Sequence, residues 1–148
     1  MKVLTGPLRL TVPIGPSEHS VLIVEDESDA RDRMALFLAF CGYTVLVAAD
    51  GVEAIDMAVR FRPTIILMDL MMPRMDGWEA TRRLKADPWT RAIPIIALSA
   101  NSQVDQDYRA RDAGCQDVIT KPCDLDSLAT MLRDFLDRRF RSSKMIIH

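Results

Sequence analysis

The stretch Pro63-Thr-Ile-Ile-Leu-Met-Asp-Leu-Met-Met-Pro-Arg-Met-Asp-Gly77 decides the fold of this chain. Residues 64–68 are apolar or β-branched and uncharged, and the run ends at Asp69. An unbroken run of this kind predicts a strand that is covered on both faces, as in the middle of a parallel sheet. Asp69 then lies at the carboxyl end of the strand, where open α/β sheets place their ligands. Because a buried charge is costly unless it is paired, Asp69 is the first candidate for a functional residue.

Four further apolar runs surround this central strand, and segments with helical signals separate them. The expected strands are residues 21–24, 43–48, 64–68, 93–98 and 116–120. The expected helices are one with an apolar face from Ala30 to Cys41, then residues 50–61, 76–87 and 102–113, and a last one after Asp124. Five strands that alternate with five helices predict an α/β fold, in which a parallel sheet lies between two helical layers.

Acidic and hydroxyl residues mark the starts of these helices. Asp50 and Asp76 are each followed three residues later by a glutamate, which is the pattern of a capping box. Ser28 and Asp124 stand where a side chain can cap the first and the last helix.

The connections restrict the topology of the expected sheet. Right-handed crossovers leave few arrangements, and the common order for five strands is 2-1-3-4-5, the flavodoxin-like three-layer sandwich. The switch point of this order lies between the first and third strands, which end in Glu25-Asp26 and in Asp69. We therefore expect a ligand site beside these three acids.

The composition indicates one globular domain without a membrane segment. The chain has 148 residues, of which 49% are hydrophobic and 27% charged. No apolar run approaches the roughly 20 residues that span a bilayer, so membrane insertion is not expected. Residues 1–19 contain several prolines and lack the pattern of a signal peptide. We expect a flexible leader at 1–19, a folded domain over 20–140 and a basic tail at 141–148.

The charges and the cysteines indicate which partners and which cellular compartment to expect. Ser20 to Asp137 holds 13 basic and 20 acidic residues, an acidic body that argues against direct binding of nucleic acid. The three cysteines form no metal-binding spacing and no even disulfide set. Unpaired cysteines favour a reducing, cytoplasmic location.

Polar residues at the strand ends should converge on one edge of the sheet. They are Glu25 and Asp26 after the first strand, Asp69, Ser99 and Lys121. Three neighbouring carboxylates must either raise a pKa or bind a cation, and hard oxygen ligands without His or Cys favour Mg²⁺. The lysine and the serine hydroxyl suit the oxygens of a phosphoryl group. A carboxylate nucleophile with these neighbours is typical of an aspartyl-phosphate site.

In this combination the chain resembles the receiver domain of two-component response regulators, in particular the single-domain, chemotaxis-regulator-like type. The resemblance runs from about residue 20 to 138 and rests on Glu25-Asp26, Asp69, Pro73, Asp76-Gly77, Ser99-Ala100 and Lys121-Pro122. It implies that Asp69 accepts a phosphoryl group from a sensor histidine kinase or a histidine phosphotransfer protein. It also implies that Ser99 and Lys121 contact that group.

The resemblance implies a cofactor and an output as well. Mg²⁺, for which Mn²⁺ could substitute, would be bound by Asp26, Asp69 and the backbone carbonyl of Met71, with Glu25 acting through a water molecule. The implied function is a switch rather than an enzyme, in which phosphorylation alters a surface that binds a downstream protein. A monomer or a weak phosphorylation-dependent dimer is expected.

Two departures from the family pattern and two alternatives remain. Val118 stands where the family often has an aromatic residue, and Met71 stands where polar residues are frequent. One alternative is a receiver-like binding module that acts without phosphorylation. The other is a phosphatase of the haloacid dehalogenase class, which also uses Asp, Lys and Mg²⁺. That class needs a second Asp two residues after the nucleophile, where this chain has Met71.

Overall fold

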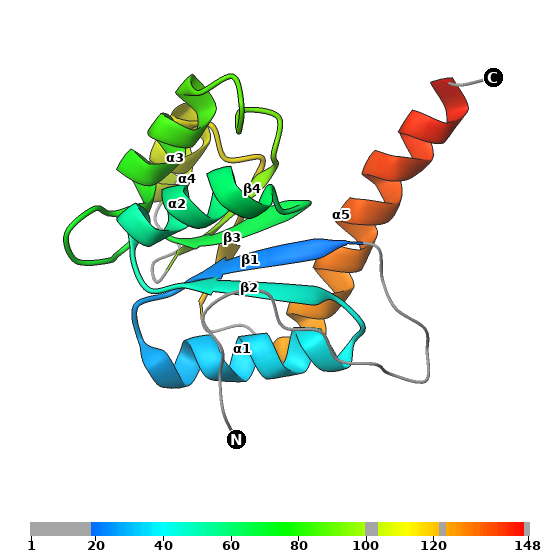
Figure 1. Ribbon diagram of the computed structural model, residues 1–148, viewed down its shortest axis with the longest axis horizontal. Coiled ribbons are helices and arrows are strands. Elements are labelled where there is room, and N and C mark those ends of the chain that lie inside the picture. Colours follow the sequence, from blue (N-terminus) through cyan, green and yellow to red (C-terminus); the bar gives the residue numbers. More distant parts are fainter. Residues whose placement is uncertain (1–18, 100–103, 122–123, 147–148) are drawn as a thin grey trace.

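The computed structural model describes residues 19–99, 104–121 and 124–146. Within these residues, five strands alternate with five helices, as the sequence predicts (Figure 1). The elements are β1 (Ser20–Val24), α1 (Ser28–Phe40), β2 (Thr44–Ala48), α2 (Gly51–Phe61), β3 (Ile65–Asp69), α3 (Gly77–Ala86), β4 (Ile95–Ser99), α4 (Val104–Ala113), β5 (Asp117–Thr120) and α5 (Leu125–Ile146).

The described strands form one parallel sheet in the order β2-β1-β3-β4-β5, which confirms the predicted topology. In the register of neighbouring strands, Val24 pairs with Met68, and Asp69 pairs with Leu98. Because parallel strands share one direction, their carboxyl ends lie along a single edge. The residues that follow β1, β3, β4 and β5 are therefore brought together there.

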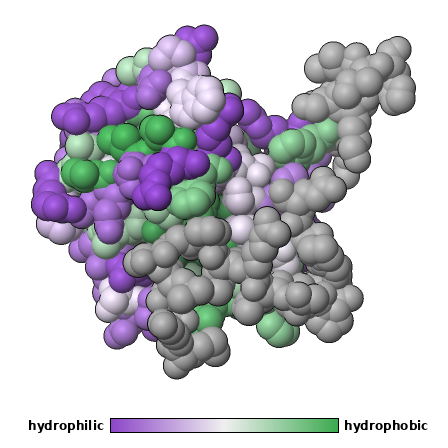
Figure 2. Space-filling model, in the orientation of Figure 1, coloured by the Kyte–Doolittle hydropathy of each residue, from purple (hydrophilic) through white to green (hydrophobic). Residues whose placement is uncertain are grey.

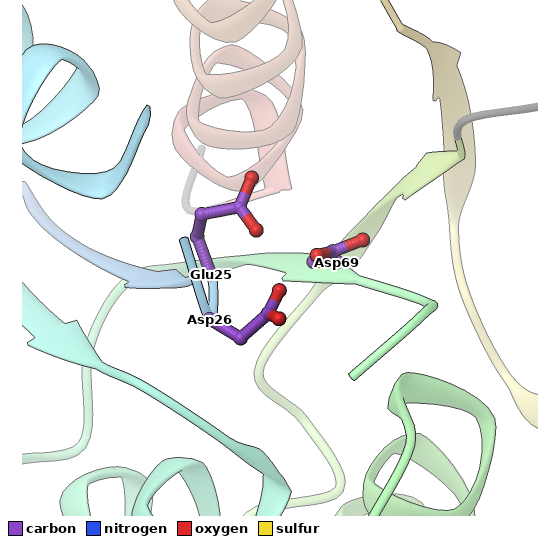
Figure 3. Close-up of side chains that lie close together, drawn as sticks. All are labelled: Glu25, Asp26 and Asp69. Atoms are coloured by element: carbon purple, nitrogen blue, oxygen red, sulfur yellow. The ribbon is translucent and has the colours of Figure 1, made fainter. Parts of the chain in front are cut away.

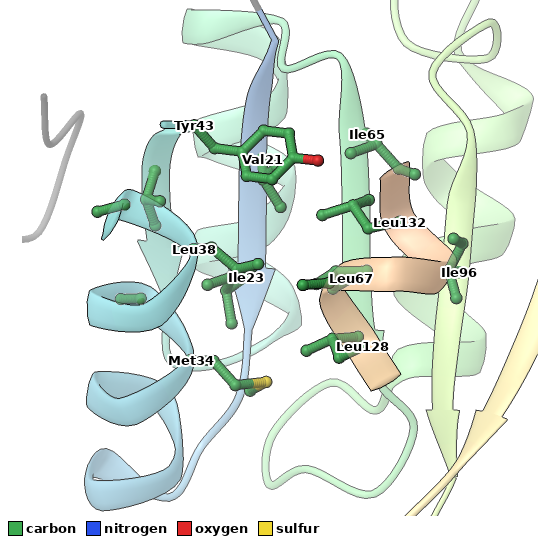
Figure 4. Close-up of a cluster of buried hydrophobic side chains, with 14 of the residues drawn as sticks. Val21, Ile23, Met34, Leu38, Tyr43, Ile65, Leu67, Ile96, Leu128 and Leu132 are labelled. Carbon is green, nitrogen blue, oxygen red and sulfur yellow. The ribbon is translucent and has the colours of Figure 1, made fainter. Parts of the chain in front are cut away.

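Two helical layers cover the sheet and complete the predicted three-layer sandwich. Helices α1 and α5 lie on one face, and α2, α3 and α4 lie on the other (Figure 1). Side chains along β1 point alternately to the two faces of the sheet. Val21 and Ile23 pack in the cluster with α1 and α5 (Figure 4), whereas Leu22 and Val24 pack in the cluster with α2, α3 and α4. The whole of β3 is buried, as expected for a central strand.

Asp50 and Asp76 cap helices α2 and α3 where the sequence predicts, but Glu53 accepts from the N–H of Ala49 rather than of Asp50, so the capping box is not closed there. The carboxylate of Asp50 accepts a hydrogen bond from the backbone N–H of Glu53 at 2.9 Å. Asp76 accepts one from the N–H of Glu79, also at 2.9 Å. Both aspartates thus satisfy a donor that the helix itself leaves unpaired.

The sequence also predicts caps for α1 and α5, and only one of these two predictions is confirmed. Asp124 accepts from the N–H of Ser127 at 2.7 Å at the start of α5, as predicted. The prediction that Ser28 caps α1 is wrong. Glu27 is the extended N-cap residue, without a side-chain capping bond, and Ser28 already lies in the first helical turn. From that position a hydroxyl no longer occupies the N-cap geometry.

Some predicted boundaries shift, and others fall outside the described residues. The fourth strand begins at Ile95 rather than at residue 93, since Pro94 has no N–H to donate, although its carbonyl accepts from the N–H of Ile66 at 3.0 Å. Helix α5 continues to Ile146. Some predictions fall outside the described residues. They concern residues 1–18 of the predicted leader, the start of the predicted helix at residue 102, and the motif residues Ala100 and Pro122.

The surface of the described region gives no sign of a membrane segment. None of its helices combines the length and the apolar character needed to cross a bilayer. Over α2 and α3 the hydrophilic surface is interrupted by apolar residues (Figure 2), among which Val52 and Val59 are exposed. Scattered apolar residues are normal on globular domains and require no partner to explain them.

Candidate functional site

The acidic residues predicted for the site converge at the carboxyl edge of the sheet. Glu25 directly follows β1 and Asp69 ends β3, and they are only 2% and 4% exposed. Asp26 is exposed beside them. One carboxylate oxygen from each of the three lies within 4.8 Å of the others (Figure 3). The expected proximity of these carboxylates is confirmed.

Lys121 provides the positive charge of this cluster. Its Nζ lies 2.6 Å from Oε1 of Glu25 and 3.6 Å from Oδ1 of Asp69. The lysine follows β5, and its backbone N–H donates to the carbonyl of Ser99 at 2.6 Å. Ser99 is fully buried at the end of β4. The structure therefore places all five predicted side chains at the same edge.

The pKa values of Glu25, Asp69 and Lys121 depend on one another. Burial, the hydrogen bond with Glu25 and the negative charge of Glu25 raise the pKa of Asp69 to about 8. Burial also opposes ionisation of Glu25, but hydrogen bonds with Asp69 and Lys121 outweigh it and lower its pKa. The difference follows from geometry, because the lysine is much closer to Glu25. Burial would lower the pKa of Lys121, yet Glu25 and Asp69 raise it, so the lysine stays charged.

The loop after β3 folds tightly around Asp69. The backbone N–H of Met71 donates to Oδ1 of Asp69 at 3.3 Å, and the N–H of Gly77 donates to the carbonyl of Leu70 at 3.0 Å. A side chain at Gly77 is impossible without rearrangement, since its Cβ would lie 2.3 Å from the carbonyl oxygen of Asp69. The Asp-Gly pair of the sequence motif thus provides both a helix cap and room for the loop.

A cavity of about 340 Å³ opens beside the acids, between the first turns of α1 and α5. Its polar lining includes Glu25 and Lys121, so it reaches the ion pair from the side of α1. The other lining residues are Glu27, Ala30, Arg33, Met34, Leu98, Asp124, Leu125 and Leu128.

Sequence reasoning missed two arginines near the site. Arg31 of α1 donates from Nη1 to the carbonyl of Glu25 at 3.0 Å. Arg74, in the loop after β3, forms an ion pair with Asp50 at the start of α2. Neither contact has a sequence signal, because arginines in helices and loops are usually exposed and unpaired.

The site is chemically suited to a divalent cation. All three candidate ligands are carboxylates from two adjacent strand ends, which is the hard-oxygen set that Mg²⁺ prefers. Burial raises the pKa of Asp69 most, and the neighbouring charge of Glu25 adds an excess of negative charge that Lys121 alone does not offset. A divalent cation would remove this excess.

Residues 21–133 match the family model of the response regulator receiver domain. The chain belongs to this family. It is therefore a phosphoryl-acceptor signalling module of two-component systems rather than a conventional enzyme, and the phosphatase alternative is not supported. Receiver domains act with histidine kinases.

Similar proteins include two curated regulators. The DNA-binding dual master transcriptional regulator RpaA of Synechocystis is 33% identical over 86% of this chain and 53% of its own length. Response regulator MprA of Mycobacterium avium is 38% identical over 80% of this chain and 51% of its own length. The chain thus spans about half the length of these relatives.

Solved receiver structures match over nearly their whole length. The receiver domain of sensor histidine kinase PA1611 from Pseudomonas aeruginosa is 35% identical, with a TM-score of 0.73 over 80% of this chain and 97% of that one. It holds a magnesium ion in its active site cleft. Chemotaxis protein CheY4 of Vibrio cholerae is 27% identical, with a TM-score of 0.76 over 80% of this chain and 98% of that one.

Proposed function

We propose that Asp69 is the phosphoryl acceptor of this receiver. The observation that supports this most is the meeting of Asp69 with Glu25, Asp26 and Lys121 at one edge of the sheet. Asp69 is the central acid of this group, at the end of the buried central strand. Its environment disfavours a bare carboxylate, and such perturbed groups cluster at functional sites.

The proposed reaction is a transfer between two nucleophiles. An oxygen of the ionised Asp69 carboxylate attacks phosphorus and forms the acyl phosphate, while the bond from phosphorus to a ring nitrogen of a partner's phosphohistidine breaks. The leaving imidazole keeps the electron pair and takes up a proton. Lys121 contributes positive charge toward the phosphoryl oxygens, and the Ser99 hydroxyl donates a hydrogen bond to one of them.

We propose that Mg²⁺ is bound by Asp26, Asp69 and the carbonyl of Met71, with Glu25 acting through water, and that Mn²⁺ can replace it. When bound, the ion supplies positive charge to the carboxylates and to the phosphoryl group. The acidic cluster supports this assignment, as does the magnesium ion in the homologous PA1611 receiver.

The test is phosphorylation with a small donor. The protein is incubated with acetyl phosphate and Mg²⁺, and the intact mass is measured. The wild type should gain one phosphoryl group, and Asp69→Asn should gain none. Asp76→Asn is the matched control, since it changes an acid of the same loop while asparagine still caps α3. A wild type that gains no mass would favour the binding module that acts without phosphorylation.

The proposed function extends to the location, the domain bounds and the partners of the protein. We propose a cytoplasmic protein whose receiver spans residues 20–140, with 1–19 and 141–148 outside it. Its phosphoryl donor would be a sensor histidine kinase or a phosphotransfer protein, and its output would be contact with a downstream protein rather than with nucleic acid. A monomer, or a weak dimer upon phosphorylation, fits this function. Sedimentation velocity with and without acetyl phosphate tests the last point.

A further inference from the structure

The loop between β3 and α3 is tied to the neighbouring helix α2 by one ion pair. The guanidinium of Arg74 contacts Oδ2 of Asp50, whose other oxygen accepts the N–H of Glu53. The Asp50 side chain is 10% exposed, unlike the acids in the other ion pairs along α2 and α3. Burial opposes its charge, but hydrogen bonds from Glu53 and Arg74 outweigh burial and lower the pKa of Asp50. The carboxylate is thus a fixed, charged anchor.

The backbone at Arg74 is held in a conformation that its residue type disfavours. Its φ is 65°, in the left-handed region. Among the described residues, Arg62 is the other non-glycine with positive φ, and it is the C-cap of α2, where this conformation is ordinary. Arg74 lies at no helix end. Strain of this kind persists only where surrounding contacts hold it.

Close backbone contacts place the same loop against the first turn of α2. A Cβ at Gly51 would lie 2.7 Å from the carbonyl oxygen of Met75, so the loop and the helix touch there. At its base the loop is closed by the bond from the Gly77 N–H to the Leu70 carbonyl. In the sequence, Met71 lies between Leu70 at the base of the loop and Met75, which touches α2.

We propose that Arg74 is a positioning residue, which through Asp50 holds the β3–α3 loop so that the backbone of Met71 stays beside Asp69. Where it concerns Mg²⁺, this rests on the proposed function, because the Met71 carbonyl is a proposed ligand. The pair then acts on the site from outside it, without touching either the metal or the phosphoryl group. Contacts of this kind commonly tune metal affinity.

The first measurement needs no metal. Amide hydrogen exchange of the metal-free protein is followed by NMR in wild type, Arg74→Ala, Arg74→Gly and Arg74→Lys. The amides of Met71 and Gly77 should exchange about tenfold faster in the alanine and glycine variants, with partial recovery in the lysine variant. Glycine relieves the backbone strain, so it separates loss of the ion pair from loss of strain.

The second measurement is Mg²⁺ affinity by calorimetric titration. Arg74→Ala should weaken binding about tenfold. Asp50→Asn should do the same, because asparagine keeps the helix cap but loses the charge. The double variant should be no weaker than either single one, since both remove the same contact. Arg60→Ala is the control, because it removes an exposed ion pair with Asp56 on the same helix and should change nothing.

The outcomes separate the two claims. If the wild type binds Mg²⁺ and the Arg74 variants match it in affinity and in amide exchange, the positioning role is wrong and the proposed function stands. If the wild type binds no Mg²⁺, the proposed metal site is wrong, and amide exchange alone decides the role of Arg74. Unchanged exchange then overturns the positioning role, and faster exchange at Met71 and Gly77 supports it.

Discussion

The two edges of the sheet handle polar groups in opposite ways. At the amino edge, the N–H of Ser20 donates to Oγ1 of Thr64 at 3.0 Å, and the N–H of Thr64 donates to Oγ of Ser20 at 3.1 Å. These groups are neutral and satisfy each other. At the carboxyl edge, Glu25 and Asp69 are buried with one lysine between them, so two carboxyl groups share one positive charge.

This difference shows which edge is built for stability and which for chemistry. Reciprocal hydrogen bonds between neutral groups add to folding stability and require no ligand. Buried like charges reduce stability and are retained where a ligand uses them. The contrast makes three predictions about the free energy of unfolding, which is measured in metal-free buffer unless Mg²⁺ is named.

The largest effect is expected from the lysine of the carboxyl edge. Lys121→Met leaves Glu25, which is 3% exposed in its side chain, without its positively charged partner. Breaking such a pair should lower the free energy of unfolding by roughly 3 kcal/mol, measured by urea denaturation. Arg83→Met removes an exposed ion pair with Glu79 and should leave the free energy of unfolding nearly unchanged. Equal losses in the two variants would contradict the contrast between buried and exposed charge.

A change of opposite sign is expected at Asp69. Its pKa is raised from 3.8 to about 8, so the folded state holds a proton that the unfolded state has released. Stability must then fall as pH rises between these values. Asp69→Asn removes this ionisable group and should be more stable than the wild type by on the order of 2 kcal/mol near pH 8, with little difference near pH 4. A variant less stable than the wild type at both pH values would show that the ionised Asp69 carboxylate is not unfavourable in the folded protein.

The smallest effect belongs to the amino edge. Ser20→Ala removes the hydroxyl that accepts from Thr64 and should lower the free energy of unfolding by about 1 kcal/mol. The loss should be the same near pH 5 and near pH 8, with or without Mg²⁺, because no charge is involved. A loss that depends on Mg²⁺ would mean that the two edges are coupled, and the simple contrast between them would fail.

The sequence was sufficient for the topology because each of its signals is local. The run that ends at Asp69 predicts a buried strand, and the capping boxes at Asp50 and Asp76 predict where helices begin. Once the alternation is recognised, parallel strands bring the five polar side chains to one edge without further information. Ser28 failed as a cap because its role depends on where the backbone becomes helical, which neighbouring residue types do not determine.

The energetic details of the site could not be predicted in the same way. Glu25 and Asp26 are adjacent in sequence, yet one is buried against Lys121 and the other is exposed. Which of them pairs with the lysine depends on packing against β5, nearly a hundred residues along the chain. The ion pair between Arg74 and Asp50 joins residues 24 positions apart and lacks a motif. Such contacts are visible only in three dimensions.

The most direct test of the acceptor is to locate the phosphoryl group on the chain. Protein treated with acetyl phosphate and Mg²⁺ is reduced with borohydride, which converts an aspartyl phosphate to homoserine, and its peptides are sequenced by mass spectrometry. Homoserine at position 69, and at none of the other aspartates, is the expected result. Homoserine at Asp26 or Asp76 with residue 69 intact would contradict the assignment of Asp69.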